Sequence, residues 1–218
     1  AWGKRQLVTF DHTKVPNTDQ TDFPVLVKIT NQSNGLFGTA QADGDDILFT
    51  SSNGTTKLSH EIETYDGATA GSKALWAWVK VPTLATATDT VLYMYYGNAS
   101  ATSQQNATGV WSNGYKASWH LADPATPVDS KGVYNGTNHG ATAITGKVGG
   151  AGNFSGSSTW ISTLMNDLPT SDLSLEFWAN EDAANGGRIF GYENQTNGTH
   201  GLGLYFPAVT TPTVIMRN

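Results

Sequence analysis

The sequence predicts an all-β protein in which a complete N-terminal β-sandwich precedes a second β-sandwich. Short β-prone apolar runs alternate with turn residues throughout the first hundred residues. Strong helix formers are scarce, and no long segment repeats its apolar residues every 3.6 positions. Only 14% of the residues are charged, and Thr, Asn, Ser and Gly take their place, as in proteins with many strands and turns.

Length and charge limit the classes of protein. A chain of 218 residues fits one large or two small domains, and 38% hydrophobic residues are enough to build cores. The formal net charge is −6, with only 12 Lys and Arg and no basic cluster, so nucleic acid and anionic membranes are poor partner candidates. No apolar run approaches the ~20 residues of a membrane span, so membrane insertion is not expected.

The first half divides into strands at its turn residues. Asn53-Gly54 is a hairpin signal between two β-prone runs, and Pro24 stands near a strand start, where a missing N–H is tolerated. The predicted strands cover residues 6–10, 23–29, 47–49, 57–63, 75–81 and 90–96. This number and spacing of strands is typical of a β-sandwich.

The strand at residues 75–81 has two distinct faces. Because side chains alternate along a strand, Trp76, Trp78 and Lys80 share one face. Ala77, Val79 and Val81 share the other. Because Trp76 and Trp78 share a face with a lysine, we expect at least one of these three side chains to be exposed.

A small polar passage follows the last of these strands. Residues 99–109 contain mainly Ala, Ser, Thr, Gln and Asn, which cannot build a core. We expect residues 1–98 to form one domain, residues 99–110 a linker, and residues 111–218 a second domain.

Five stretches of the first domain carry a family resemblance. They are TDFPVLV (21–27), ADGDDILFT (42–50), HEIETYD (60–66), AWVKVP (77–82) and YMYYGN (93–98). In this order they resemble an extracellular domain, the domain of unknown function 2341, over residues 1 to about 98. The resemblance implies an extracellular or cell-surface location and no established activity.

Four stretches of the second domain resemble another family. They are WHL (119–121), VDSKGVYNGT (128–137), GKVGGAGNFSG (146–156) and LSLEFWA (173–179). Together they are similar to the first part of a concanavalin-A-like, laminin-G-type lectin domain, which implies a jelly-roll sandwich with Trp119 and Trp178 on core strands. The later strands of that family have no counterpart before Asn218, so we expect this domain to be truncated.

One pair of acids resembles a catalytic arrangement. Glu61 and Glu63 share a strand face about 6.7 Å apart at the backbone, and two carboxylates can serve as nucleophile and acid in a glycosidase. Asp66 would need a bulge to join them. Their order differs from that of concanavalin-like glycosidases, so we interpret them as solvent-facing charges beside an inward Ile62. No enzyme activity is predicted, although a glycosidase is not excluded.

Two acidic loops are candidate calcium sites. Asp43, Asp45 and Asp46 lie close together in one loop, and hard oxygen ligands suit calcium. The alternative is that these side chains bond turn N–H groups. Asp129 and Asn135 occupy the loop that resembles a structural calcium segment of the lectin family. No other cofactor is expected.

Other catalytic and metal patterns are missing from the sequence. The five histidines show no His-x-His or i,i+4 spacing: His12, His60, His120, His139 and His200. Surface or core roles are expected for them rather than zinc binding. Cysteine is absent, which excludes disulfides and thiolate metal sites.

Eight Asn-x-Ser/Thr sequons are candidates for glycosylation. They begin at Asn31, Asn53, Asn98, Asn106, Asn135, Asn153, Asn194 and Asn197. They indicate either a glycosylated surface protein or a chance result of a composition rich in Thr and Asn in an unglycosylated bacterial protein.

Aromatic residues supply the candidate sugar site. Sugar-binding modules stack pyranose rings on exposed aromatics and bond hydroxyls through amides. The candidates are Trp160, Tyr192, Asn194 and Trp76, with core packing as the alternative for each aromatic side chain.

The predicted function is a non-catalytic adhesion or carbohydrate-binding part of a larger, secreted surface protein, which the sequons make a candidate glycoprotein. The partner would be a glycan or a surface protein. The alternative is a structural subunit or spacer of a surface layer, filament or virion, with self-association through exposed strand edges.

Overall fold

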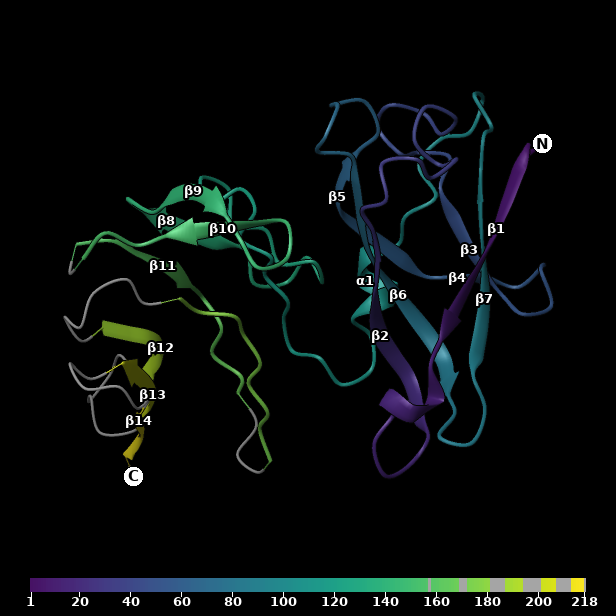
Figure 1. The fold of residues 1–218 in the computed structure, drawn as a ribbon. Helices are drawn as coiled ribbons and strands as arrows, with labels where there is room; N and C mark the ends of the chain where they lie inside the picture. Colours follow the sequence, from purple (N-terminus) through teal and green to yellow (C-terminus); the bar gives the residue numbers. More distant parts are fainter. Residues whose placement is uncertain (157, 169–171, 181–186, 194–200, 207–212, 218) are drawn as a thin grey trace.

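The computed structural model describes residues 1–156, 158–168, 172–180, 187–193, 201–206 and 213–217. Its elements are almost all strands (Figure 1). The N-terminal elements are β1 (Lys4–Phe10), the 3-10 helix η1 (His12–Lys14), β2 (Gln20–Ile29), β3 (Leu48–Ser51), β4 (Lys57–Leu58), β5 (His60–Asp66), β6 (Ala74–Leu84) and β7 (Thr90–Tyr96). After them come α1 (Ala107–Val110), β8 (Gly136–His139), β9 (Thr142–Thr145), β10 (Gly150–Asn153), β11 (Trp160–Thr163), β12 (Gly187–Glu193), β13 (Gly201–Phe206) and β14 (Thr213–Arg217). The all-β prediction is confirmed.

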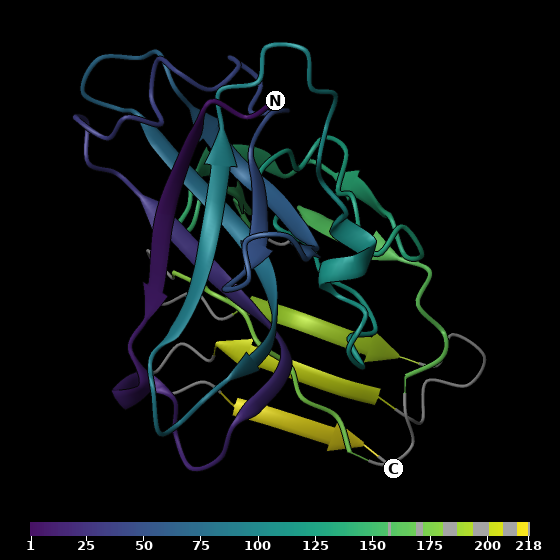
Figure 2. The ribbon, with the colours of Figure 1, turned by 90° about the vertical axis from the view of Figure 1, so that its right-hand side faces the viewer.

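The N-terminal part is a sandwich of two antiparallel sheets, with strand orders β1-β7-β3-β4 and β2-β6-β5. Figure 2 shows β1 and β7 running side by side in opposite directions. Buried side chains from both sheets form one core, including Phe49 and Met94 of the first sheet and Leu75 of the second, each 0% exposed. This apolar interior accounts for the stability of the sandwich.

Strand β6 presents the two faces that its sequence predicts. Leu75, Ala77 and Val79 are buried, whereas the alternate side chains are partly exposed. The strand continues to Leu84, beyond the predicted end at Pro82. Pro82 is exposed and has no cross-strand partner in the β2–β6 register, so its missing N–H breaks no bond of that ladder.

A β-bulge in β5 changes which side chains face outward. Ile62 pairs with Ala77 and Thr64 with Trp76, which leaves Glu63 as the extra residue. Ile62 and Tyr65 both pack against the core, three positions apart rather than two. The bulge therefore keeps Glu61 and Glu63 on the outer face while the core contacts continue past them.

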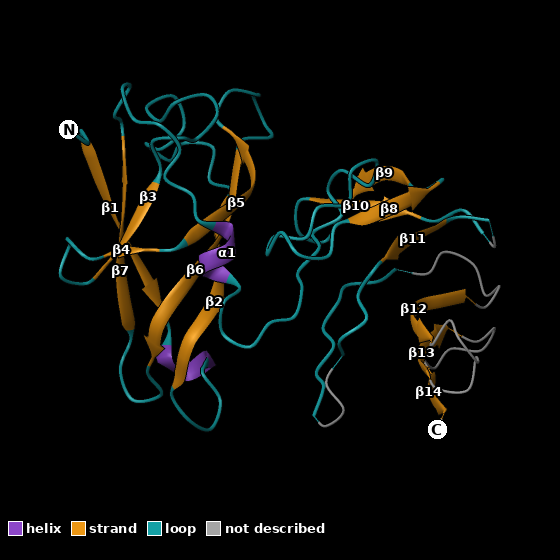
Figure 3. Cartoon of the chain, turned by 180° about the vertical axis from the view of Figure 1, so that it is seen from behind, coloured by secondary structure: helices purple, strands orange, loops and turns teal. Residues whose placement is uncertain are grey.

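The segment after β7 lies against the edge of β5. The backbone N–H of Asn106 donates to the carbonyl of His60 at 2.8 Å, and that of Ile62 donates to Oε1 of Gln105 at 2.6 Å. Helix α1 follows, with Val110 and the next residue, Trp111, buried. Figure 3 shows this helix between the sandwich and the later strands. The polar passage is thus docked along the sandwich.

The described residues after α1 form three smaller sheets on the β2-β6-β5 side of the sandwich (Figures 1 and 3). Their strand orders are β10-β9, β11-β8 and β12-β13-β14. The predicted strand at 173–179 is not formed, and Trp178 is 72% exposed there instead of packing in a core. Trp119 makes an isolated bridge to Asp129 and is partly buried. None of the helices in the described part of the chain has the length and apolarity that a membrane crossing requires.

Candidate functional site

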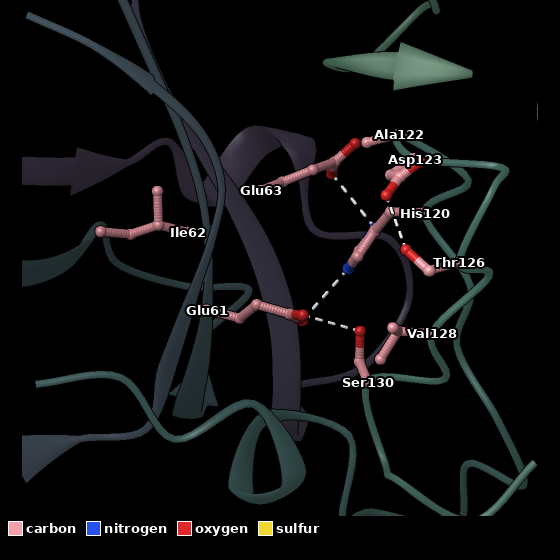
Figure 4. Close-up of a pocket in the computed structure, with 9 residues that line it drawn as sticks. All are labelled: Glu61, Ile62, Glu63, His120, Ala122, Asp123, Thr126, Val128 and Ser130. Carbon is pink, nitrogen blue, oxygen red and sulfur yellow. Dashed lines mark hydrogen bonds and ion pairs between the residues drawn. The ribbon is translucent and has the colours of Figure 1, made fainter. Parts of the chain in front are cut away.

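The outer face of β5 meets the loop that contains His120 (Figure 4). Glu61 and Glu63 point from the strand toward this loop, and the His120 ring lies between them. Nε2 of His120 is 3.1 Å from Oε2 of Glu61, and Nδ1 is 3.2 Å from Oε2 of Glu63. We call these three residues the Glu–His–Glu clasp. It joins positions 59 residues apart in the sequence.

Two tryptophans complete the carboxylate hydrogen bonding. Nε1 of Trp111 donates to Glu61 at 2.6 Å, and Nε1 of Trp78 donates to Glu63 at 2.7 Å. Both indoles also contact the His120 ring, with centroids 5.8 Å away for Trp111 and 6.1 Å for Trp78. The aromatic rings thus surround the ionic contact and limit its access to water.

Ser130 adds a bond from the far end of the same loop. Its hydroxyl donates to Oε1 of Glu61 at 2.7 Å, so each oxygen of that carboxylate accepts at least one hydrogen bond. The side chains of Glu61, Glu63 and His120 are 14%, 3% and 17% exposed. The expectation that the two acids face solvent fails in this respect, because residues 111–130 cover them.

The clasp shifts the protonation of its members. Burial opposes a charge on His120, but the hydrogen bonds and negative charges of Glu61 and Glu63 outweigh it and raise the pKa of His120 to about 9. Burial also opposes a charge on Glu61 and by itself would raise the pKa of that carboxyl. The hydrogen bonds from His120, Trp111 and Ser130 outweigh burial and lower the pKa of Glu61. The clasp therefore contains an imidazolium and an ionised Glu61 near neutral pH.

The clasp differs from two familiar hydrolytic sites, the acid pair of a glycosidase and the nucleophilic triad of a hydrolase. A glycosidase acid needs a carboxyl with a raised pKa, whereas the pKa of Glu61 is lowered. A nucleophilic triad needs the histidine between the hydroxyl and the acid, whereas Glu61 lies between Ser130 and His120. The adjoining cavity, about 220 Å³, is lined by Glu61, Glu63, His120, Ser130 and neighbouring residues. The arrangement is suited to holding two segments together.

The sugar-binding candidates lie in separate places. Trp160 on β11 is 49% exposed and stacks on His139 of β8, with ring centroids 4.4 Å apart and planes at 14°. Trp76 lies on the outer face of β6 beneath the ammonium of Lys28, which is 4.3 Å from its ring centroid. Tyr192 belongs to β12, and Asn194 lies outside the described residues.

In the first calcium candidate, two carboxylates bond nearby backbone. Asp43 accepts from the N–H of Asp45 at 3.1 Å. Asp46 is fully buried and accepts from the N–H groups of Gln41, Gly97 and Asn98 at 2.7 to 2.8 Å. Asp46 therefore ties this loop to the end of β7 through bonds that an ion would have to replace.

The second calcium candidate has a similar organisation. Asp129 is 1% exposed, and its two oxygens accept backbone N–H bonds at 2.9 to 3.2 Å from Ser118, Lys131, Val133 and Tyr134. Asn135 accepts from the N–H of Asp129 at 3.0 Å. These bonds fix the loop that carries Ser130.

A further group of metal-ligating side chains lies at the end of the sandwich. Ligand atoms of Asp11, His12 and Asp89 lie within 4.8 Å of one another. Nδ1 of His12 already bonds Asp89 at 2.6 Å, and Asp11 accepts from Thr13. Hydrogen bonds within the surface loops account for this geometry.

The sequons differ in their surroundings. The amide of Asn106 donates to Ser59 at 3.2 Å and that of Asn53 to Thr56 at 2.8 Å, so both nitrogens are engaged. Asn153 and Asn135 are exposed, whereas Asn98 is half-buried. Asn31 is exposed and caps its own turn, at 3.1 Å from the Ser33 nitrogen. Asn194 and Asn197 lie outside the described residues.

Sequence reasoning missed His120, Trp111 and Ser130 as partners of the acids. The available signal was the pair of acids beside an outward-facing tryptophan on the neighbouring strand. No local pattern identified which distant histidine would cover them, because the contact depends on the path of residues 97–120.

One known family matches part of the chain. Residues 43–117 match the domain of unknown function (DUF2341). The matched segment contains Glu61, Glu63, Trp78 and Trp111, and it ends before His120. Neither a curated protein nor a solved structure matches the chain. The region from the loop before β3 to the residues after α1 is thus similar to DUF2341.

Proposed function

We propose that this chain is a non-catalytic carbohydrate-binding or adhesion part of a larger surface protein outside the cell. The observation that supports this proposal most directly is that the half-exposed Trp160 ring is held in place by stacking on His139. An aromatic ring fixed before binding can stack on a sugar with little further loss of conformational freedom. The resemblance of four stretches within residues 119–179 to a concanavalin-A-like, laminin-G-type lectin supports a glycan as the ligand.

A glycan array followed by calorimetry tests this proposal. We expect Trp160→Ala to weaken binding of a positive glycan about 5- to 10-fold, as the loss of about 1 kcal/mol of stacking implies. Trp178→Ala, which removes another exposed tryptophan, is the matched control. The lectin proposal fails if no sugar binds, or if both variants bind as the wild type does.

A second arm of the array addresses calcium. The same glycans are measured with and without EDTA, and with Asp129→Asn and Asp43→Asn. Calcium has a role if EDTA abolishes binding and added calcium restores it. If glycan binding is unchanged in EDTA, then glycan binding does not require calcium, and the role of these two acids is to accept the backbone hydrogen bonds described above.

The second candidate function is a structural spacer, and the clasp favours it. Contacts that fix one β-unit against another suit a protein that carries load or spacing between surfaces. Analytical ultracentrifugation of the natural full-length protein tests the assembly. A dispersed monomer at all concentrations would contradict a role as a layer or filament subunit.

A further inference from the structure

The Glu–His–Glu clasp has a hydrogen-bonding requirement of its own. Each ring nitrogen of His120 faces a carboxylate oxygen, at 3.1 and 3.2 Å. A neutral imidazole has one N–H and one bare nitrogen, so it can donate to only one of two carboxylates. Both bonds form together only when the ring is protonated. Between two ionised carboxylates, this geometry therefore selects the imidazolium.

Loss of that proton would leave a repulsive contact in a covered place. The bare nitrogen would face an ionised carboxylate that is shielded by Trp78 or Trp111. Burial of an unpaired charge is costly. Movement of the His120 loop away from β5 would relieve that cost by restoring water to both acids.

The charged groups near the clasp come from β5, from β6 and from the segment after His120. Glu61 and Glu63 belong to β5, and Asp123 lines the same cavity from the loop after His120. The ammonium of Lys80 on β6 bonds Ser112, and that of Lys131 bonds the carbonyl of Trp111, each at 3.0 Å. Of the described bonds to the ring, only those of Glu61 and Glu63 are made by charged groups.

We propose that the outer face of β5 is an imidazolium-binding site that His120 occupies within the same chain. Through it, residues 111–134 are held on the N-terminal sandwich, and release of the ring proton loosens this docking. The site is distinct from the Trp160 surface, so its test is independent of glycan binding.

Hydrogen exchange on the whole chain tests the proposal. The reporters are the backbone N–H groups of Asn106, Ser118 and Ser130, which bond His60, Asp129 and Ser118. In His120→Ala at pH 7, we expect the protection factors of Ser118 and Ser130 to fall at least tenfold. His139→Ala is the matched control, since that histidine contacts Trp160 outside the clasp. Unchanged protection in His120→Ala would overturn the proposal.

Chemical rescue distinguishes a binding site from general packing. Imidazole added to His120→Ala is expected to restore protection, because its cation can donate to both carboxylates. The cation of 1-methylimidazole has a single N–H and should restore much less. Equal rescue by both, or rescue by neither, would contradict a site for a doubly donating imidazolium.

The wild-type chain gives a readout that needs no substitution. Its protection factors at Ser118 and Ser130 should stay constant from pH 6 to 8 and fall as the pH passes about 9. Glu63→Gln, which keeps the shape but removes one charge, should move this fall to lower pH. A pH-independent protection factor in the folded wild type would overturn the coupling.

Discussion

Strand β5 has a buried histidine on its inner side and a partly buried one on its outer side, and the two differ in charge. On the inner side, His60 belongs to the strand, is 0% exposed, and packs edge-on against Phe49 with ring centroids 5.3 Å apart. Among the residues that the structure describes, neither of its nitrogens has a hydrogen-bond partner, and burial lowers the pKa of His60 to about 4. On the outer side, His120 bonds two carboxylates and its pKa rises to about 9.

This difference between the two pKa values shows that the charge of each histidine ring depends more on its hydrogen-bond partners than on its burial. Both side chains leave water, yet only His120 meets groups that stabilise the cation. The inner face of the β2-β6-β5 sheet behaves as an apolar core. The outer face, which in a lone sandwich would be wet, is a polar and aromatic docking surface. Each following prediction changes one side of this contrast.

The largest effect is expected from the inner side. Phe49→Ala should lower the free energy of unfolding by about 3–5 kcal/mol, because Phe49 is 0% exposed and leaves a cavity. Trp178→Ala, at a side chain that is 72% exposed, should change it by less than about 0.5 kcal/mol. Urea unfolding followed by circular dichroism gives both values. If the two variants lost similar amounts of unfolding free energy, then Trp178 would be packed as tightly as Phe49, which would contradict the prediction.

The second prediction concerns acid and His60. The unfolded chain protonates this ring below about pH 6.5, whereas the folded chain does so only near 4. Stability should therefore fall as the pH falls between these values, by about 2 kcal/mol at pH 5. His60→Leu should flatten this slope, since no hydrogen bond of the ring is lost.

Denaturant titrations between pH 7 and 5 check this slope, since they remain above the range in which Glu61 protonates, its pKa being lowered. If the His60→Leu variant keeps the wild-type slope, His60 does not carry the acid sensitivity.

The third prediction addresses the outer side. Glu61→Gln should cost about 2 kcal/mol, less than a fully buried pair, because the Glu61 and His120 side chains keep 14% and 17% exposure. Asp123→Asn is the matched control: this acid lines the same cavity, but in the described part of the chain its carboxylate accepts hydrogen bonds from Ala125 and Thr126 of its own turn alone. A larger loss from Asp123→Asn would contradict the assignment of the clasp to Glu61 and Glu63.

The smallest effect is expected at Trp76. Lys28→Ala removes the ammonium over that ring and should cost about 0.5–1 kcal/mol. It should also make the indole more accessible, which fluorescence quenching by acrylamide measures. If quenching is unchanged, then Lys28 does not cover the ring.

Local sequence was enough for much of the sandwich. Alternation predicted that Ala77 and Val79 share one face of the strand and Trp76 lies on the other, because a strand repeats every two residues, and the structure buries the first face. Asn53-Gly54 predicted a turn, and the structure places Gly54 there with a φ of 76°. Such features depend on neighbours within a few residues.

The clasp could not be predicted in the same way. Whether Glu61 faces water or protein depends on where a loop 59 residues later lies, and no local pattern encodes that distance. The bulge at Glu63 also shifts the alternation of β5, so a simple period of two misplaces Tyr65. For residues 173–179, the resemblance to the lectin family implied a strand, yet a strand also needs a partner ladder, and none forms there.

The most direct measurement of the contrast is the ring ¹⁵N and ¹³C NMR titration of the folded, full-length chain with labelled histidine. We predict that His120 remains a cation through pH 8 and loses its proton near 9, whereas His60 remains neutral down to about 4. Titration of both rings near 6.5, the ordinary value for histidine, would contradict the account. Assignment by His60→Leu and His120→Ala makes the outcome unambiguous.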